Sequence, residues 1–172
     1  MRNRFALAAL ALLFTAACGY HVAGHGDLVP KNIKTIAIPG FANVTVRYDL
    51  ARRLPEDIAR EFISRTRYAV VSDPAQADAV LTGAVVNFGY YPTTFDPVTF
   101  RATAVQTIVT LQLRLTDRAT GKDIFNRPNA EFRQVYEIAE NPQQYFDESS
   151  TAMIRLSRDV ARNVVSAVLE NF

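Results

Sequence analysis

The strongest constraint on the fold of this chain is the segment Arg101–Asp117, in which apolar and polar residues alternate. Its odd positions include the apolar residues Val105, Val109, Leu111, Leu113 and Leu115. Its even positions include the polar residues Gln106, Thr110, Gln112, Arg114 and Thr116. Because successive side chains of a strand point to opposite faces, this pattern predicts a long strand with one face on a core and the other facing water or a partner.

Four further strands are expected around this segment. Apolar and β-branched runs bounded by turn residues predict strands at residues 33–39, 68–71, 79–91 and 124–138. Pro128 interrupts the last run. A bulge or loop is expected there, because proline cannot donate a hydrogen bond to the strand ladder.

Two helices complete the pattern. Asp49 can cap the first, which runs to about Arg65 and either begins or kinks at Pro55. Asn141 followed by Pro142 is typical of a helix start, so a long final helix is expected from there to about Glu170. Each helix has an apolar stripe at helical spacing, formed by Leu50, Leu54, Ile58 and Phe62 in the first and by Met153, Leu156, Val160, Val164, Ala167 and Val168 in the last. The separate row of Arg155, Arg158 and Arg162 is interpreted as a solvated face.

This order of elements predicts an α+β fold. We expect a two-layer sandwich in which two helices pack on one face of a four- to five-stranded mixed, mostly antiparallel sheet. The other face of the sheet is expected to be polar and open. Since 172 residues is the usual size of one domain, residues 33–172 are expected to form a single one.

The first 17 residues have the anatomy of a secretory signal peptide. Arg2 and Arg4 precede the ten apolar residues Phe5–Phe14, which are too few to span a bilayer, and small residues follow. Without residues 1–17 the totals of 19 basic and 17 acidic residues become 17 and 17. A mature chain with no net charge gives no reason to expect a nucleic-acid partner, which would need a basic face.

Cys18 is the only cysteine and stands where cleavage is expected. The segment resembles the lipobox of bacterial lipoproteins, with alanine at the two preceding positions, although Thr15 replaces the usual leucine. The resemblance implies an N-palmitoyl, S-diacylglycerol cysteine that anchors the chain to the membrane. Residues 18–32, with three glycines and a proline, then form a tether, and Gly19 in place of aspartate implies the outer membrane. The alternatives are an ordinary signal peptide with a chance cysteine and a short membrane anchor.

Residues that could form a catalytic or metal-binding site are sparse. The single thiol is the expected lipid attachment point, and the two histidines, His21 and His25, lie in the expected tether. The sequence contains no phosphate-binding glycine motif, and its acidic residues are scattered. We therefore expect a binding or assembly protein with no enzymatic activity, no metal and no cofactor.

Four short motifs together resemble the LptE family of lipoproteins. They are Cys18-Gly19-Tyr20-His21-Val22, Leu28-Val29-Pro30 before the first strand, Val98-Thr99-Phe100-Arg101, and Asn141-Pro142-Gln143. The resemblance implies a lipoprotein that faces the periplasm, plugs the lumen of the outer-membrane barrel LptD and helps that barrel to assemble. It also implies that the protein assists the insertion of lipopolysaccharide into the outer leaflet. A polar sheet face suits this role, because barrel lumens of this kind are polar.

Lipopolysaccharide carries phosphates and carboxylates, so its binding site is expected to hold cations. Arg101 matches the family's Phe-Arg position, and Arg133 on the next strand could lie near it. Surface charge on a strand is the alternative interpretation of both. Residues 145–147 lack the lysine that the family has in that region, and the loop 92–98 could touch either the barrel or the lipid. The competing hypothesis for the whole protein is a lipid-anchored α/β subunit of an oligomeric secretion pore.

Overall fold

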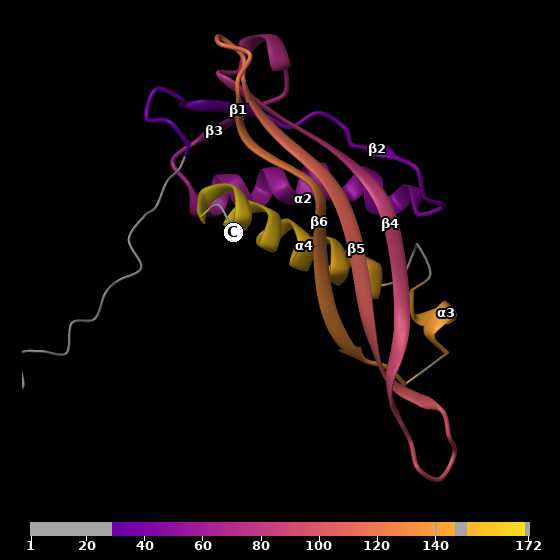
Figure 1. Ribbon diagram of the computed structural model, residues 1–172. Coiled ribbons are helices and arrows are strands. Elements are labelled where there is room, and N and C mark those ends of the chain that lie inside the picture. Colours follow the sequence, from indigo (N-terminus) through magenta and orange to yellow (C-terminus); the bar gives the residue numbers. More distant parts are fainter. Residues whose placement is uncertain (1–28, 140, 147–150, 171–172) are drawn as a thin grey trace, which may run out of the picture.

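The segment of alternating residues forms β5 (Ala102–Asp117), the central member of three long strands. The computed structural model describes residues 29–139, 141–146 and 151–170. The expected signal peptide, Cys18 and both histidines lie outside these residues. β4 (Ala79–Phe95) and β6 (Asp123–Glu137) pair with β5 on either side, both antiparallel to it (Figure 1).

Three short strands extend the sheet beyond β4. β1 (Thr35–Ala37) runs parallel to β4, and β3 (Ala69–Val71) runs parallel to β1. β2 (Ala42–Asn43) also pairs in parallel with β4, further along that strand. The described sheet is therefore mixed and has the order β3-β1-β4-β5-β6, with β2 as a sixth strand beside β4. The sequence does not predict β2 because two residues carry no periodicity.

Both long helices cover the same face of the sheet (Figure 1). They are α2 (Tyr48–Arg65) and α4 (Thr151–Glu170), and their apolar stripes are buried apart from the half-buried Ala167. The predicted α+β sandwich is confirmed. α2 begins at Tyr48 and continues through Pro55, so the proline does not start the helix. Asp49 does not cap it either, but lies in the first turn and pairs with Arg52 and Arg53.

β5 buries one face and exposes the other, as the alternation of its residues predicts. Its apolar residues at odd positions from Val105 to Leu115 are at most 1% exposed, whereas Gln112 and Arg114 are exposed on the opposite face. The expected interruption at Pro128 is a bulge, because Leu111 pairs with Ala130 and Leu113 with Arg127. Two residues of β6 thus stand opposite one residue of β5.

The predicted final helix is wrong at its beginning. Asn141 does cap a helix, since its side chain accepts a hydrogen bond from the Gln143 N–H, but α3 (Pro142–Tyr145) ends after four residues. Phe146 follows α3 and is completely buried among aromatic rings of the sheet, and α4 begins at Thr151. A continuous helix would have to give up this burial, so packing against distant residues overrides the local helical pattern.

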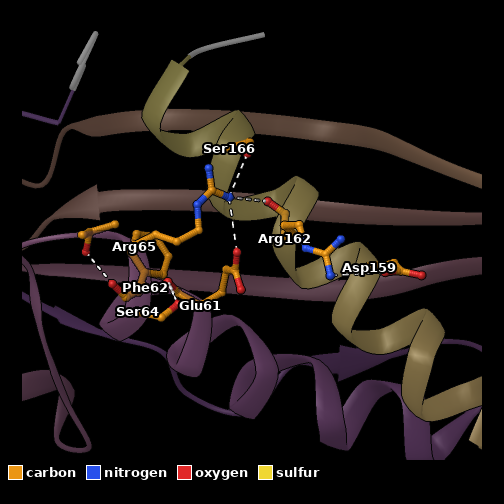
Figure 2. A network of polar contacts seen from close by, with 8 residues as sticks. Glu61, Phe62, Ser64, Arg65, Asp159, Arg162 and Ser166 are labelled. Atoms are coloured by element: carbon orange, nitrogen blue, oxygen red, sulfur yellow. Dashed lines mark hydrogen bonds and ion pairs between the residues drawn. The ribbon is translucent and has the colours of Figure 1, made fainter. Parts of the chain in front are cut away.

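Polar contacts join the two long helices. The Ser157 hydroxyl donates a 2.6 Å hydrogen bond to the buried Asp57 carboxylate, which also pairs with Arg60. Figure 2 shows the second contact, in which Arg65 Nη1 donates to Ser166 Oγ at 3.0 Å and lies 3.3 Å from a Glu61 carboxylate oxygen. The helices therefore form one layer against the sheet.

Gly83 is required by the packing of Phe41. A Cβ atom on residue 83 would stand only 2.6 Å from two ring atoms of Phe41. We predict that Gly83→Ala will lower the free energy of unfolding by about 1–3 kcal/mol, the usual cost of overpacking. Thermal unfolding followed by circular dichroism tests this, with Gly40→Ala as the control because nothing lies within 4 Å of a Cβ there. Equal melting temperatures for the two variants would show that the Phe41 ring moves aside freely.

Candidate functional site

The free end of the β4–β5 hairpin extends beyond the two long helices, where residues 96–101 connect the strands (Figure 1). Asp96 organises this connection. Its carboxylate accepts hydrogen bonds from the Val98 and Thr99 N–H groups and from the Thr99 hydroxyl, at 2.6–2.9 Å. Hydrogen bonds from Thr99 and then Val98 hold the pKa of Asp96 below its ordinary value. The carboxylate that shapes the turn is therefore ionised at neutral pH.

Apolar side chains project from this turn into solvent. Phe95, Val98 and Phe100 are 56%, 83% and 79% exposed. Phe100 has a φ angle of 53°, a conformation that a bulky residue rarely adopts, and its N–H donates to the Asp96 carbonyl. The turn thus holds an aromatic residue in an unusual backbone conformation while leaving its ring in water. Such local strain is typical of functional segments.

Arg101 lies beside these apolar residues, directly before β5. It is exposed, and its side chain makes no ion pair or hydrogen bond with another described residue. Arg101 lines a shallow hollow of about 400 Å³ together with Asp96, Thr99 and Asn141. Among the described residues, the hairpin end therefore combines a cation that has no ion-pair partner with exposed apolar surface.

Arg133 does not join Arg101. It pairs in register with Ile108, which is seven residues further along the chain than Arg101. At about 3.3 Å per residue this separates the two positions by roughly 23 Å. The guanidinium of Arg133 lies 2.8 Å from the Glu131 carboxylate, on the open face of the sheet. The two candidate arginines therefore lie on different parts of the surface and do not form one compact cluster.

Other described surfaces have fewer groups that could bind a ligand. One hollow, of about 570 Å³, lies between α2 and the β2 region and is lined by Phe41, Tyr48 and Arg52 among others. In the described part of the chain no three acidic, histidine or cysteine residues gather as metal ligands. None of the helices within that part is long and apolar enough to cross a membrane. The arginine row on α4 is exposed, as expected, with Arg162 3.6 Å from Asp159.

The hairpin end is suited to binding an amphiphile. The guanidinium can pair with a phosphate or carboxylate, and the aromatic and aliphatic side chains can contact hydrocarbon. Sequence analysis identified Arg101 but missed Phe95, Val98 and Phe100 as partners. The Asp96-Pro97 pair, a common turn signal, could have placed these residues at an exposed tip.

Comparison with known proteins supports one family. A model of the LptE family, described as lipopolysaccharide-assembly, matches residues 33–168. None of the curated protein sequences matches this chain.

Three solved structures resemble this chain to different degrees. Protein XCC0632 from Xanthomonas campestris has a TM-score of 0.56 at 10% identity, over 80% of this chain and 83% of that one. The subunit of the PelC dodecamer from Paraburkholderia phytofirmans has a TM-score of 0.50 at 18% identity, over 79% and 86%. Rare lipoprotein B from Shewanella oneidensis has a TM-score of 0.47 at 13% identity, over 80% and 92%. At these identities the first two similarities show the fold alone.

Proposed function

Because the chain belongs to the LptE family of lipopolysaccharide-assembly proteins, we propose that it is a lipid-anchored, non-enzymatic partner of the outer-membrane barrel LptD. In this role it faces the periplasm, plugs the barrel lumen, helps the barrel to assemble and assists the insertion of lipopolysaccharide into the outer leaflet. The family match supports the proposed role in lipopolysaccharide assembly. The chemistry of the hairpin end supports a direct contact with lipopolysaccharide. The protein would recognise this ligand without making or breaking a covalent bond.

The guanidinium of Arg101, which pairs with no other described residue and lies beside exposed apolar residues, is the central observation. Lipopolysaccharide combines phosphate groups with acyl chains, and these two chemistries match Arg101 and the Phe95–Phe100 turn respectively. Because both groups lie at one end of the β4–β5 hairpin, the protein can engage the border between headgroup and hydrocarbon. No cofactor is needed for such binding.

The open face of the sheet supports the role as a plug. Thr82, Asn87, Gln112 and Arg114 are exposed on the strands that the helices cover only from the other side. A polar surface of this kind is compatible with the water-filled, polar interior of an outer-membrane barrel. It would gain nothing from burial in hydrocarbon.

Affinity purification from native outer membranes tests the partnership with the barrel. We expect a large β-barrel protein to remain bound in a one-to-one ratio. Recovery of a homo-oligomer without a barrel would contradict the proposal and support the secretion-pore hypothesis. The similarity to the PelC subunit does not favour that hypothesis, since it shows the fold alone.

The charge of Arg101 is predicted to determine lipopolysaccharide binding. A hydrogen bond to a charged group contributes about 1.5–3 kcal/mol, so Arg101→Glu, which also adds repulsion, is expected to raise the dissociation constant at least about tenfold. The interaction is expected to weaken with added salt, because exposed charges are screened over about 8–10 Å. Titration calorimetry of the full chain in detergent with lipopolysaccharide measures both effects.

Lys122→Glu provides a matched control for this charge change. Lys122 is exposed in the turn between β5 and β6, at the opposite end of the long strands. This variant is expected to bind like the wild type, and circular dichroism verifies that both variants are folded. Equal weakening by the two substitutions would indicate a nonspecific effect of net charge and would remove Arg101 from the site.

A further inference from the structure

A second surface with binding chemistry lies on the open face of the sheet. The strand register places two rows of residues next to each other there. One row runs from Gly89 through Ile108 to Arg133, and the next from Tyr91 through Gln106 to Val135. With strands about 4.8 Å apart, the outer members of each row are roughly 10 Å apart. We call these six residues the sheet platform.

The ring of Tyr91 lies against the backbone of Gly89. A Cβ atom on residue 89 would stand 3.2 Å from the Tyr91 hydroxyl oxygen and 3.3 and 3.5 Å from two ring carbons. The glycine therefore leaves room for the ring to lie on the sheet. Tyr91 is nevertheless 56% exposed, so much of the ring remains open to solvent.

Polar and apolar groups surround this ring in a mixed pattern. Gln106, half-buried beside Tyr91, has an amide that can donate and accept hydrogen bonds. Arg133 is exposed, and its contact with Glu131 uses one of five N–H donors. Val135, 60% exposed, adds an apolar contact at the outer edge. The platform thus presents a flat aromatic ring, a planar amide, a cation and an aliphatic group within about 10 Å.

This combination matches a phosphorylated sugar. The electron-rich face of an aromatic ring attracts polarised C–H groups, such as those on one face of a pyranose. Amide groups pair with sugar hydroxyls, and a guanidinium pairs with phosphate or carboxylate. A hydrocarbon chain would leave the Gln106 amide and the remaining donors of Arg133 unused.

We infer that the sheet platform is a second ligand subsite, which binds a phosphorylated sugar unit of lipopolysaccharide. The inference rests on the proposed function and deepens it. Tyr91 pairs in register with Gln106, five residues beyond Arg101, so the two subsites are roughly 16 Å apart along β5. Arg101 contacts the acylated end of the ligand, and the platform contacts its carbohydrate.

Deacylated lipopolysaccharide, which keeps its sugars and phosphates but has lost its acyl chains, is the probe that tests this subsite. Calorimetric titration of the full chain in detergent is expected to show binding. Tyr91→Ala should raise the dissociation constant about fivefold to tenfold, the scale of an aromatic contact, whereas Tyr91→Phe keeps the ring and should stay within about twofold. Tyr48→Ala, which removes an exposed tyrosine from α2, is the matched control and should change nothing.

Arg133→Gln tests whether the platform recognises the phosphate group of the probe. It is expected to weaken binding of the deacylated probe about tenfold but to leave a dephosphorylated version unaffected. If intact lipopolysaccharide binds and the deacylated probe does not, the platform is overturned while the proposed function stands. Equal affinities of wild type and Tyr91→Ala for the probe would also overturn it. If neither ligand binds, both the platform and direct recognition of lipopolysaccharide fail.

Discussion

Phe146→Ala is expected to destabilise the protein by about 3–5 kcal/mol, the range for removing a buried phenylalanine side chain from a core. Phe146 is completely buried, and four aromatic rings surround it. The ring centroids of Tyr145, Tyr90, Tyr136 and Phe88 lie 4.9, 5.7, 5.8 and 6.1 Å away. Most of these pairs meet edge to face, which adds to the energy of burial.

The substitution is also expected to affect contacts made by the backbone and neighbours of Phe146. Arg47 stacks over the Phe88 ring at 4.9 Å, and its guanidinium donates a 3.0 Å hydrogen bond to the Phe146 carbonyl oxygen. Burial, and then the hydrogen bond to Asp159, raise the pKa of the Tyr136 phenol, which keeps that group protonated as a donor to α4. Loss of the Phe146 ring would therefore loosen contacts between the sheet, α3 and both long helices.

Thermal unfolding followed by circular dichroism measures the effect. For a protein of this size 1 kcal/mol corresponds to about 2–4 °C, so the melting temperature should fall by roughly 6–20 °C. Phe95→Ala removes the same side chain from an exposed position at the hairpin end and should leave the melting temperature nearly unchanged. A small decrease in the Phe146 variant, comparable to that of the Phe95 variant, would show that the aromatic cluster contributes little to stability.

The same residue explains where sequence analysis of the fold fails. Local patterns predicted every described strand except β2, both apolar helix stripes and an interruption at Pro128, because each depends on neighbours within a few positions. The break between α3 and α4 depends on Phe146 contacting Phe88 and Tyr90, more than fifty residues earlier in the chain. A periodicity window contains no information about such a contact.

The candidate site likewise combines features that local sequence predicts with features that only the fold reveals. Arg101 could be selected from its place at the start of the alternating strand and from family resemblance. Its separation from Arg133 follows from the β5–β6 register. The contact between Tyr91 and Gly89 is local, two residues apart on one face of β4, but only the folded structure shows that the ring lies on the glycine.

Cys18→Ala is expected to abolish attachment to the membrane through the lipid anchor. Cys18 is the only thiol of the chain and therefore the only possible site of S-diacylglycerol modification. A single myristoyl chain gives a membrane binding constant of about 10⁴ M⁻¹, and several chains give stable attachment, so loss of all chains should remove the lipid-mediated part of membrane binding.

Metabolic labelling with palmitate and separation of the inner and outer membranes measure this effect. The wild type is expected to be labelled and to fractionate with the outer membrane, whereas Cys18→Ala should be unlabelled and held at the outer membrane only through the barrel and lipopolysaccharide. Gly19→Asp is the matched control, because it keeps the cysteine and is expected to keep the label but to move the protein to the inner membrane. Val29 is already buried in the fold, eleven residues after Cys18, so a fully extended connection holds the domain within about 40 Å of the bilayer. Normal labelling of Cys18→Ala would disprove the anchor and, with it, the mechanism that keeps the hairpin end close to its lipid ligand.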